Sequence, residues 1–276
     1  MSEKKRDGRR SARRAIQEQR AKEQARQKRK RTLTVGAGVV AVLAIAAGIG
    51  VAVASHDSSS TSAASGPVPS PKGATGKDSL VIPVGAADAP SVLTIYEDFR
   101  CPACDAFEKE FTPTIHTLED GGKIRTEYHL VTLIDGNLGG SGSLNAGNAA
   151  ACAQDQGRFR PYHDVLYANQ PEEQQDKFAD KNTLLTLADK VPGLRNTAFT
   201  TCVNNGTFND WMRKSNSAFD SSGFNATPTI LLNGKNIFGT GSATLTPASL
   251  TAMVDAANKG KPLGKVTPTP SATASP

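Results

Sequence analysis

Cysteine and histidine are scarce in this chain of 276 residues, which has four of each. No second C-x-x-C pair accompanies Cys101 and Cys104, and no histidine stands at ligand spacing from a cysteine, so we expect no metal site. No cysteine lies near the apolar stretch at residues 33–54, which excludes a lipoprotein anchored through a modified cysteine.

Excess positive charge is absent outside the first 31 residues. Residues 1–31 contain fourteen Lys/Arg and four acidic residues, a net charge of +10, whereas the whole chain carries +6 and the remainder therefore −4. A mildly acidic remainder lacks the basic surface that nucleic acid requires, so we expect no nucleic-acid partner.

An unbroken apolar stretch follows the basic tail. Leu33 to Ala54 has Thr34 as its only clearly polar side chain, and as a helix it would be about 33 Å long, enough to cross the ~30 Å hydrocarbon core. The basic residues before it favour a cytoplasmic N-terminus. We expect a cytoplasmic tail at 1–31, a single transmembrane helix at 32–54 that anchors the chain in the cell membrane, and an extracytoplasmic remainder. Cleavage after Ala54 as a signal peptide is the alternative.

Composition divides the rest of the chain into three parts. Residues 55–78 are rich in Ser, Thr, Gly, Ala and Pro and predict a disordered linker. Residues 79–264 are long enough for one domain with its own core. Residues 265–276 again predict a disordered tail.

Hydrophobic periodicity within 79–264 indicates an α/β domain. It predicts strands at 80–82, 91–96, 123–133, 229–232 and 236–238, helices at about 101–118 and 247–258, and only helices within 143–222. This order predicts one sheet interrupted by an all-helical insertion at about 140–222.

The Cys101-Pro102-Ala103-Cys104 motif lies where a strand ends and a helix begins. A thiol at a helix N-terminus meets free N–H groups and the positive end of the helix dipole, which lower its pKa. Pro102 suits the first helical turn, and Arg100 adds a neighbouring cation. The pattern predicts Cys101 as the exposed nucleophile and Cys104 as the resolving partner of a redox pair. A zinc half-site and an inert disulfide are the alternatives.

Three segments together resemble the DsbA-like thioredoxin family over about residues 79–258: Tyr96-Glu97-Asp98-Phe99-Arg100-Cys101-Pro102-Ala103-Cys104, the stretch from Ala146 to His163, and Ala226-Thr227-Pro228-Thr229. The resemblance implies a thioredoxin-like fold and a thiol–disulfide oxidoreductase that needs no cofactor. It implies a cis Thr227-Pro228 bond, with Pro228 beside the disulfide and the Thr227 backbone aligning a substrate strand. It also implies reduced exported proteins as substrates and a membrane quinone-linked partner that reoxidises the pair.

Three departures from the family concern the direction of electron flow. Ala103 stands where strongly oxidising members carry histidine, and Ile95 where members often bury a carboxylate, with Asp98 and Glu97 expected on other faces. Thr227 is commoner in the isomerase branch.

An oxidase is the leading hypothesis for the function. The alternatives are an isomerase or reductase on the same scaffold, and a tethered non-catalytic binding or chaperone module. Asp98 is expected to modulate the pair.

The remaining two cysteines both lie in segments with helical patterns. We expect Cys152 and Cys202 to form a structural disulfide that joins two helices of the insertion, and an electron relay to the redox pair is the alternative. His116, His129 and His163 have no partner spacing and are expected to be surface or core residues.

Overall fold

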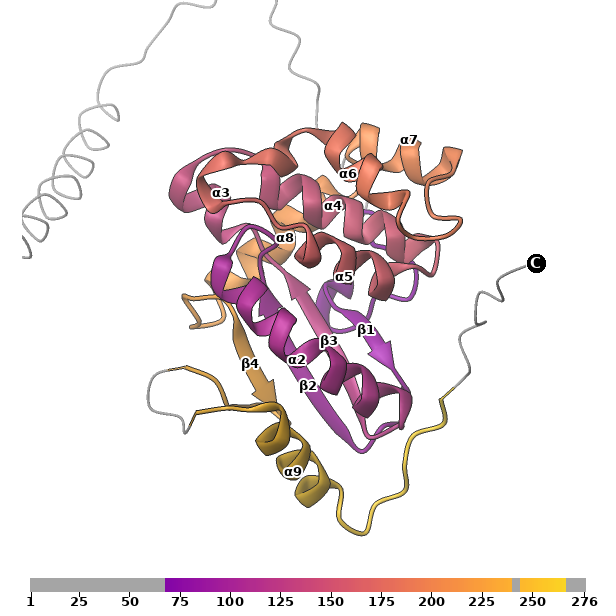
Figure 1. Cartoon of the computed structure of the whole chain (residues 1–276), viewed down its shortest axis with the longest axis vertical. Helices are drawn as coiled ribbons and strands as arrows, with labels where there is room; N and C mark the ends of the chain where they lie inside the picture. Colours follow the sequence, from indigo (N-terminus) through magenta and orange to yellow (C-terminus); the bar gives the residue numbers. More distant parts are fainter. Residues whose placement is uncertain (1–67, 240–243, 267–276) are drawn as a thin grey trace, which may run out of the picture. The chain divides into compact units, whose positions relative to one another are not determined.

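The computed structural model describes residues 68–239 and 244–266. Within them, one five-stranded sheet has the strand order β1-β3-β2-β4-β5 (Figure 1). Strands β2 and β3 are parallel, and every other neighbouring pair is antiparallel. The strands are β1 (Ile82–Gly85), β2 (Ser91–Glu97), β3 (Ile124–Leu130), β4 (Thr229–Leu232) and β5 (Lys235–Asn236).

Helices cover both faces of this sheet. The helix α2 (Pro102–Asp120) follows β2 and lies beside α9 (Pro247–Asn258), and both contact the sheet. Between β3 and β4 the chain forms a helical insertion, which Figure 1 shows gathered at one end of the sheet. Its helices are α3 (Leu133–Leu138), α4 (Gly142–Asp155), α5 (Phe159–Ala168), α6 (Lys181–Ala188), α7 (Thr197–Asn205) and α8 (Asn209–Asp220), with short 3-10 turns at Glu173–Gln175 and Lys177–Ala179.

Alternation along the central strands decides which side chains face each layer. In β2, Leu93 and Ile95 are fully buried, and Glu97 has the same parity because side chains two residues apart share a face. Tyr96 points to the other face, where its ring stacks on His129 of β3 at 4.3 Å between centroids and approaches Phe219 of α8 at 5.6 Å.

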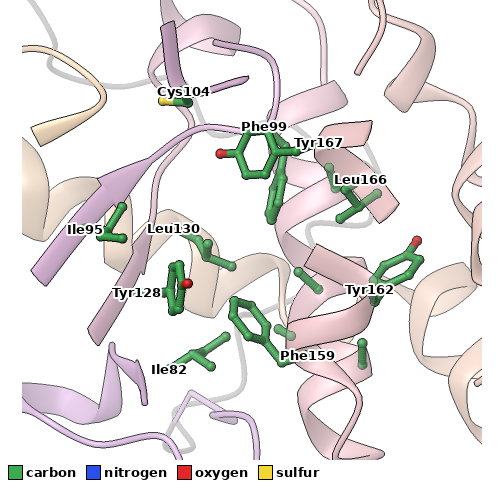
Figure 2. Close-up of a cluster of buried hydrophobic side chains, with 14 of the residues drawn as sticks. Ile82, Ile95, Phe99, Cys104, Tyr128, Leu130, Phe159, Tyr162, Leu166 and Tyr167 are labelled. Carbon is green, nitrogen blue, oxygen red and sulfur yellow. The ribbon is translucent and has the colours of Figure 1, made fainter. Parts of the chain in front are cut away.

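The main core lies between the sheet and α5 (Figure 2). Sheet residues such as Ile95 and Tyr128 face a row of large side chains from α5, which includes Phe159 and Tyr167. The Tyr128 and Phe159 rings lie 5.2 Å apart. The insertion is therefore part of the same core as the sheet, because α5 packs on the face that also carries α2.

Local sequence signals explain the elements whose bounds the sequence predicted well. Helix α9 begins with a capping box, in which the Thr246 hydroxyl accepts the Ser249 N–H at 3.1 Å and the Ser249 hydroxyl accepts the Thr246 N–H. The β4–β5 hairpin turns at Asn233 and Gly234, which adopt φ angles of 50° and 81°. The predicted helix at 247–258 is confirmed.

Three strands differ from prediction at their ends. The first begins at Ile82 rather than at residue 80, the third ends at Leu130 rather than at residue 133, and the last is limited to 235–236. The third strand ends because the Ile134 N–H donates to the buried Asp98 carboxylate at 2.8 Å, which starts α3 at Leu133. Such a contact joins segments 36 residues apart and leaves no local signal.

The predicted linker at 55–78 extends too far. Residues 68–78 belong to the folded domain: the Lys72 N–H donates to Asp155 at 2.7 Å, Thr75 forms a β-bridge with Val81, and Lys77–Ser79 is a 3-10 turn. Composition could not show that residues 68–78 are folded, because their backbone groups bond to residues in other parts of the chain. At the other end, the Lys265 N–H donates to Asp88 at 2.8 Å.

The expected transmembrane helix at 32–54, the basic tail and residues 267–276 lie outside the described residues. Within 68–239 and 244–266, no helix combines the length and apolar character needed to cross a membrane.

A disulfide joins two helices of the insertion. Cys152 lies in α4 and is fully buried, and it pairs with Cys202 in α7 across a sequence separation of 50 residues. Because the cross-link closes a loop of this size, it removes many conformations from the unfolded chain.

Replacement of both residues, Cys152→Ala with Cys202→Ala, is expected to lower the free energy of unfolding by up to about 4 kcal/mol in the chain-entropy model. Urea denaturation followed by circular dichroism measures this change. Fully reduced wild type is the control and should resemble the variant; a variant as stable as the oxidised wild type would contradict the prediction.

Candidate active site

Cys101 lies at the junction between β2 and α2. It is the N-cap residue of α2 and precedes Pro102 in the first turn, where the missing proline N–H leaves no bond unmade. The Cys101 N–H donates to the Asp98 carbonyl at 2.9 Å, and Gln170, just beyond α5, donates to the Phe99 and Cys101 carbonyls at 2.9 and 3.0 Å. The insertion therefore helps to hold the loop before the motif.

The two sulfurs of the motif have different surroundings. Both cysteines are free thiols in the structure. Cys101 was expected to be exposed, but it is only 6% exposed. Cys104 is fully buried, whereas Pro102 and Ala103 between them are exposed. A partner molecule can therefore reach the motif through its Pro-Ala surface and the edge of Cys101, while Cys104 stays behind it.

Hydrogen bonds lower the pKa of the Cys101 thiol to about 6, from an ordinary value of 9.0. The bond from the Cys104 thiol has the largest effect, burial opposes it, and the Thr227 side chain and the N–H groups of Cys104 and Ala103 add to it. These N–H groups belong to the first turn of α2, so the predicted helix N-terminus contributes as expected.

The surroundings of Cys104 have the opposite effect. Burial, followed by the neighbouring Cys101, raises the pKa of Cys104 well above 9.0, and the Glu97 carboxylate raises it further. Near neutral pH, Cys101 therefore ionises readily to the thiolate, whereas Cys104 stays protonated.

Thr227 and Pro228 border the pair on the β4 side. The Thr227-Pro228 bond is cis, and the Cys101 thiol donates to the Thr227 carbonyl at 3.4 Å. A thiolate has no proton to donate, and the buried Thr227 hydroxyl, which has no hydrogen-bond partner among the described residues, can then turn its proton toward the sulfur. Sequence positions 126 apart thus meet at the reactive sulfur.

Arg100 does not act as a free cation beside Cys101. Its side chain is 2% exposed and forms ion pairs with Asp135 at 2.6 Å and Asp176 at 3.0 Å. It also donates to the carbonyls of Gly139 and Glu173, both at 2.9 Å. Arg100 was expected to add a neighbouring cation, but the insertion supplies two carboxylates that neutralise its charge and that the local sequence does not show.

Asp98 is buried and organises the same loop. One carboxylate oxygen accepts the Arg100 N–H and the other the Ile134 N–H, both at 2.8 Å. Burial raises the pKa of Asp98 to about 7, although these hydrogen bonds lower it. Asp98 therefore connects the start of α2 to the start of α3.

Three buried residues behind Cys104 were missed by the sequence reasoning. Glu97 of β2, Glu108 of α2 and His163 of α5 each place one oxygen or nitrogen atom within 4.8 Å of the others. Glu97 Oε1 and His163 Nε2 are hydrogen-bonded at 2.8 Å. Glu97 was expected on another face, yet its parity with Leu93 and Ile95 indicates an inward side chain. Glu108 stands one helical turn after Cys104, which is the corresponding helical signal.

We call Glu97, Glu108 and His163 the buried triad. Its donor atoms are of types that bind divalent metals, although the Glu97–His163 contact already pairs two of them. Burial opposes charge on His163, but Glu97 and Asp164 together raise its pKa well above the ordinary value. Burial raises the pKa of Glu108 to about 8.

Comparison with known proteins places the chain among redox proteins. The family model described as Thioredoxin matches residues 77–256. "Disulfide bond formation protein D" of Bacillus subtilis (strain 168) is 27% identical over 157 residues, which cover 56% of this chain and 68% of that protein. The reduced form of the disulfide bond oxidoreductase DsbG from Mycobacterium tuberculosis is 28% identical with a TM-score of 0.57, covering 66% of this chain and 89% of that one. Oxidised DsbA of the same organism is 28% identical with a TM-score of 0.56, covering 66% and 94%.

Replacement of Cys104 by alanine is expected to raise the pKa of Cys101, because it removes the hydrogen bond with the largest lowering effect. The ultraviolet absorbance of the thiolate, titrated on the reduced protein, measures this pKa, with a wild-type midpoint near 6. Lys109→Gln, which removes an exposed cation of α2, is the control. An unchanged midpoint in the alanine variant would contradict this assignment.

The same shift predicts how the stability of the reduced protein depends on pH. The pKa of Cys101 is about 6 in the folded chain and near its ordinary value of 9.0 when unfolded. Ionisation therefore stabilises the fold increasingly as pH rises from about 6 to 9, and this contribution is lost as pH falls through about 6. In the reduced Cys104→Ala variant, whose Cys101 pKa should be higher, the free energy of unfolding should depend less on pH over this range.

Proposed function

Since the chain belongs to the thioredoxin family and is a DsbA-like thiol–disulfide oxidoreductase, we propose that it oxidises cysteines of exported proteins through Cys101 and Cys104. The observation that carries the proposal is the contrast between the two thiols. Cys101 has a pKa lowered to about 6 beside an exposed surface, and Cys104 is buried with a raised pKa. The curated relative is named for disulfide bond formation.

The chemistry begins from the oxidised pair. A substrate thiolate attacks the Cys101 sulfur, a new S–S bond forms, the Cys101–Cys104 bond breaks, and its electron pair goes to Cys104. A second substrate thiol then attacks the substrate sulfur of this mixed disulfide and expels Cys101. Because the pKa of Cys101 is low, it leaves readily as a thiolate. The substrate departs oxidised and the pair remains reduced.

Thr227 and Pro228 are proposed to guide the substrate. The Thr227 carbonyl lies 3.4 Å from the Cys101 sulfur, so an extended substrate segment along this loop would bring its own sulfur toward Cys101. Reduced exported proteins are the proposed substrates. A membrane quinone-linked protein is the proposed partner that removes two electrons from the reduced pair.

An isomerase or reductase on the same scaffold is the second candidate. Thr227 favours it because this residue is commoner in the isomerase branch of the family. The absence of histidine at Ala103 favours it because it removes one source of stabilisation of the Cys101 thiolate. A lower pKa of Cys101 stabilises the reduced form only, so each pKa unit adds about 30 mV to the potential of this two-electron couple. The reduction potential therefore discriminates the two candidates.

We expect a reduction potential between about −120 and −230 mV, together with activity in refolding a reduced substrate protein. Equilibration with glutathione measures the potential. Ala103→His should raise it by tens of millivolts, Cys104→Ser should trap mixed disulfides through Cys101, and Cys101→Ser should abolish refolding. A value near −270 mV without refolding activity would indicate a reductant.

Membrane anchoring is part of the proposal. It is supported by fourteen basic residues in 1–31 directly before the apolar stretch Leu33–Ala54. Residues 1–31 are proposed to remain in the cytoplasm and the redox domain to lie outside. The protein should stay in the membrane fraction after carbonate extraction and keep its N-terminal tail. A mature N-terminus at Ser55, found by N-terminal sequencing, would show cleavage instead.

A further inference from the structure

Gln170 lies just beyond the end of α5, and its side chain reaches the loop before the redox pair. Its Nε2 atom donates to the Phe99 carbonyl at 2.9 Å and to the Cys101 carbonyl at 3.0 Å. A side-chain amide has two N–H groups, enough for one bond to each carbonyl. The inference that follows rests on the proposed function and concerns what these two bonds do for the reactive sulfur.

The end of α5 fixes the position of Gln170. Its backbone N–H donates to the carbonyl of Tyr167, which is buried in the main core, at 3.2 Å. The neighbouring Asn169 side chain donates to the Val165 carbonyl and accepts from Lys190, both at 2.7 Å. The insertion therefore sets where the Gln170 side chain lies, independently of the redox loop.

The peptide between Cys101 and Pro102 has a carbonyl as its only hydrogen-bonding group, because proline has no N–H. This carbonyl also accepts the Asp105 N–H at 3.1 Å, which begins the hydrogen bonding of α2. Since a carbonyl oxygen has two lone pairs, it can accept from Asp105 and from Gln170 together. The orientation of the peptide is thus fixed from two sides, by the helix and by the insertion.

The orientation of this peptide decides where the Cys101 sulfur lies. Cys101 is the N-cap residue of α2, with φ and ψ angles of −75° and 118°, and a change in ψ would turn its side chain relative to the first helical turn. In the observed conformation, hydrogen bonds to the sulfur lower the pKa of Cys101 to about 6, against the effect of burial. They involve the Cys104 thiol, which has the largest effect, the Thr227 side chain, and the N–H groups of Cys104 and Ala103.

We propose that Gln170 is a positioning residue for the nucleophile of the redox pair. By holding the Phe99 and Cys101 carbonyls, it keeps the Cys101 sulfur directed at the first turn of α2. The reactivity of the pair then depends on the helical insertion. A reactive side chain needs such support, because it stays in a productive geometry only when neighbouring hydrogen bonds and packing fix it.

Arg100 is the rival for this role, since it lies beside Cys101 and also joins the redox loop to the insertion. Its bonds, however, start from the guanidinium group and end on two carboxylates and two carbonyls of the insertion. These bonds fix the Arg100 side chain, and none of them involves the peptide after Cys101. Gln170 bonds to that peptide directly, so the geometry favours Gln170.

The test uses Gln170→Met in the full-length chain in detergent micelles. Methionine is similar in length to glutamine but has no N–H group, so both carbonyls lose this donor while no charge changes. The reduced protein is alkylated with iodoacetamide over a range of pH, and the midpoint of the rate profile gives the pKa of Cys101, because Cys104 is buried. The wild-type midpoint should lie near 6. The variant midpoint should be higher by about half a unit to one unit, which corresponds to the net effect of one hydrogen bond.

The reduction potential is the second readout. A thiolate is stabilised only in the reduced protein, so Gln170→Met should have a lower potential than wild type, by about 15 to 30 mV when the same shift is converted at ~30 mV per pKa unit. Equilibration with glutathione measures the potential. A residue that only stabilised the fold would change the melting temperature and leave both the midpoint and the potential as in wild type.

Asn169→Ala is the matched control. It removes the side-chain hydrogen bonds of the neighbouring residue at the same helix end, those with Val165 and Lys190. Thermal stability should fall in this variant, while the midpoint and the potential should stay as in wild type. A wild-type midpoint in Gln170→Met, or an equal shift in both variants, would overturn the proposal.

Gln170→Glu provides a second variant in case the methionine variant does not fold. Glutamate keeps the shape of the side chain, but its carboxylate cannot donate and adds a negative charge near the thiolate, so the midpoint should rise further than in Gln170→Met. In wild type, NMR should show that the Gln170 side-chain amide protons exchange slowly with solvent, because they are hydrogen-bonded. An unchanged midpoint in Gln170→Glu, or fast exchange of both amide protons, would contradict the role of Gln170.

Iodoacetamide replaces the biological substrate in these measurements. The positioning role of Gln170 can therefore fail while the wild-type protein still refolds reduced substrates, and it can hold in a protein whose potential makes it a reductant. The two proposals are thus tested separately.

Discussion

The junction between β2 and α2 is the constraint on which the rest of this structure depends. A buried strand must end, and a helix must begin within four residues, so that one sulfur sits at the free N–H groups of the first turn and the next lies one turn deeper. This placement makes Cys101 acidic and Cys104 resistant to ionisation. The cis Thr227-Pro228 bond, the buried carboxylates and the insertion all surround this junction.

The insertion contributes to the site as well as to the core. Gln170 holds the carbonyls of the loop before the motif, and Asp135 and Asp176 neutralise Arg100. An ion pair this deeply buried is maintained only when its partners are well placed, since an unpaired charge there would cost several kcal/mol. The helical insertion and the redox loop are therefore one structural unit, even though the chain leaves the sheet to form the insertion.

Local signals in the sequence were enough to predict much of the fold. The capping box at Thr246, the Asn233-Gly234 turn and the apolar spacing in α2 each act within a few residues, and the structure has helices and turns where these signals occur. The role of Arg100 could not be read in the same way, because its partners come from positions 35 and 76 residues later. Glu97 was predictable in principle from strand parity, but its pairing with His163 depends on how α5 packs.

The Cys152–Cys202 bond has a consequence for how new copies of the protein mature. Each chain leaves the ribosome with four thiols, and its fold includes one disulfide outside the working pair. Under the proposed activity, that bond is of the kind the mature protein makes in others, so existing copies could oxidise incoming ones. The supply of oxidised protein would then grow in proportion to what is already present, and the first copies made in a cell that lacks it would mature slowly.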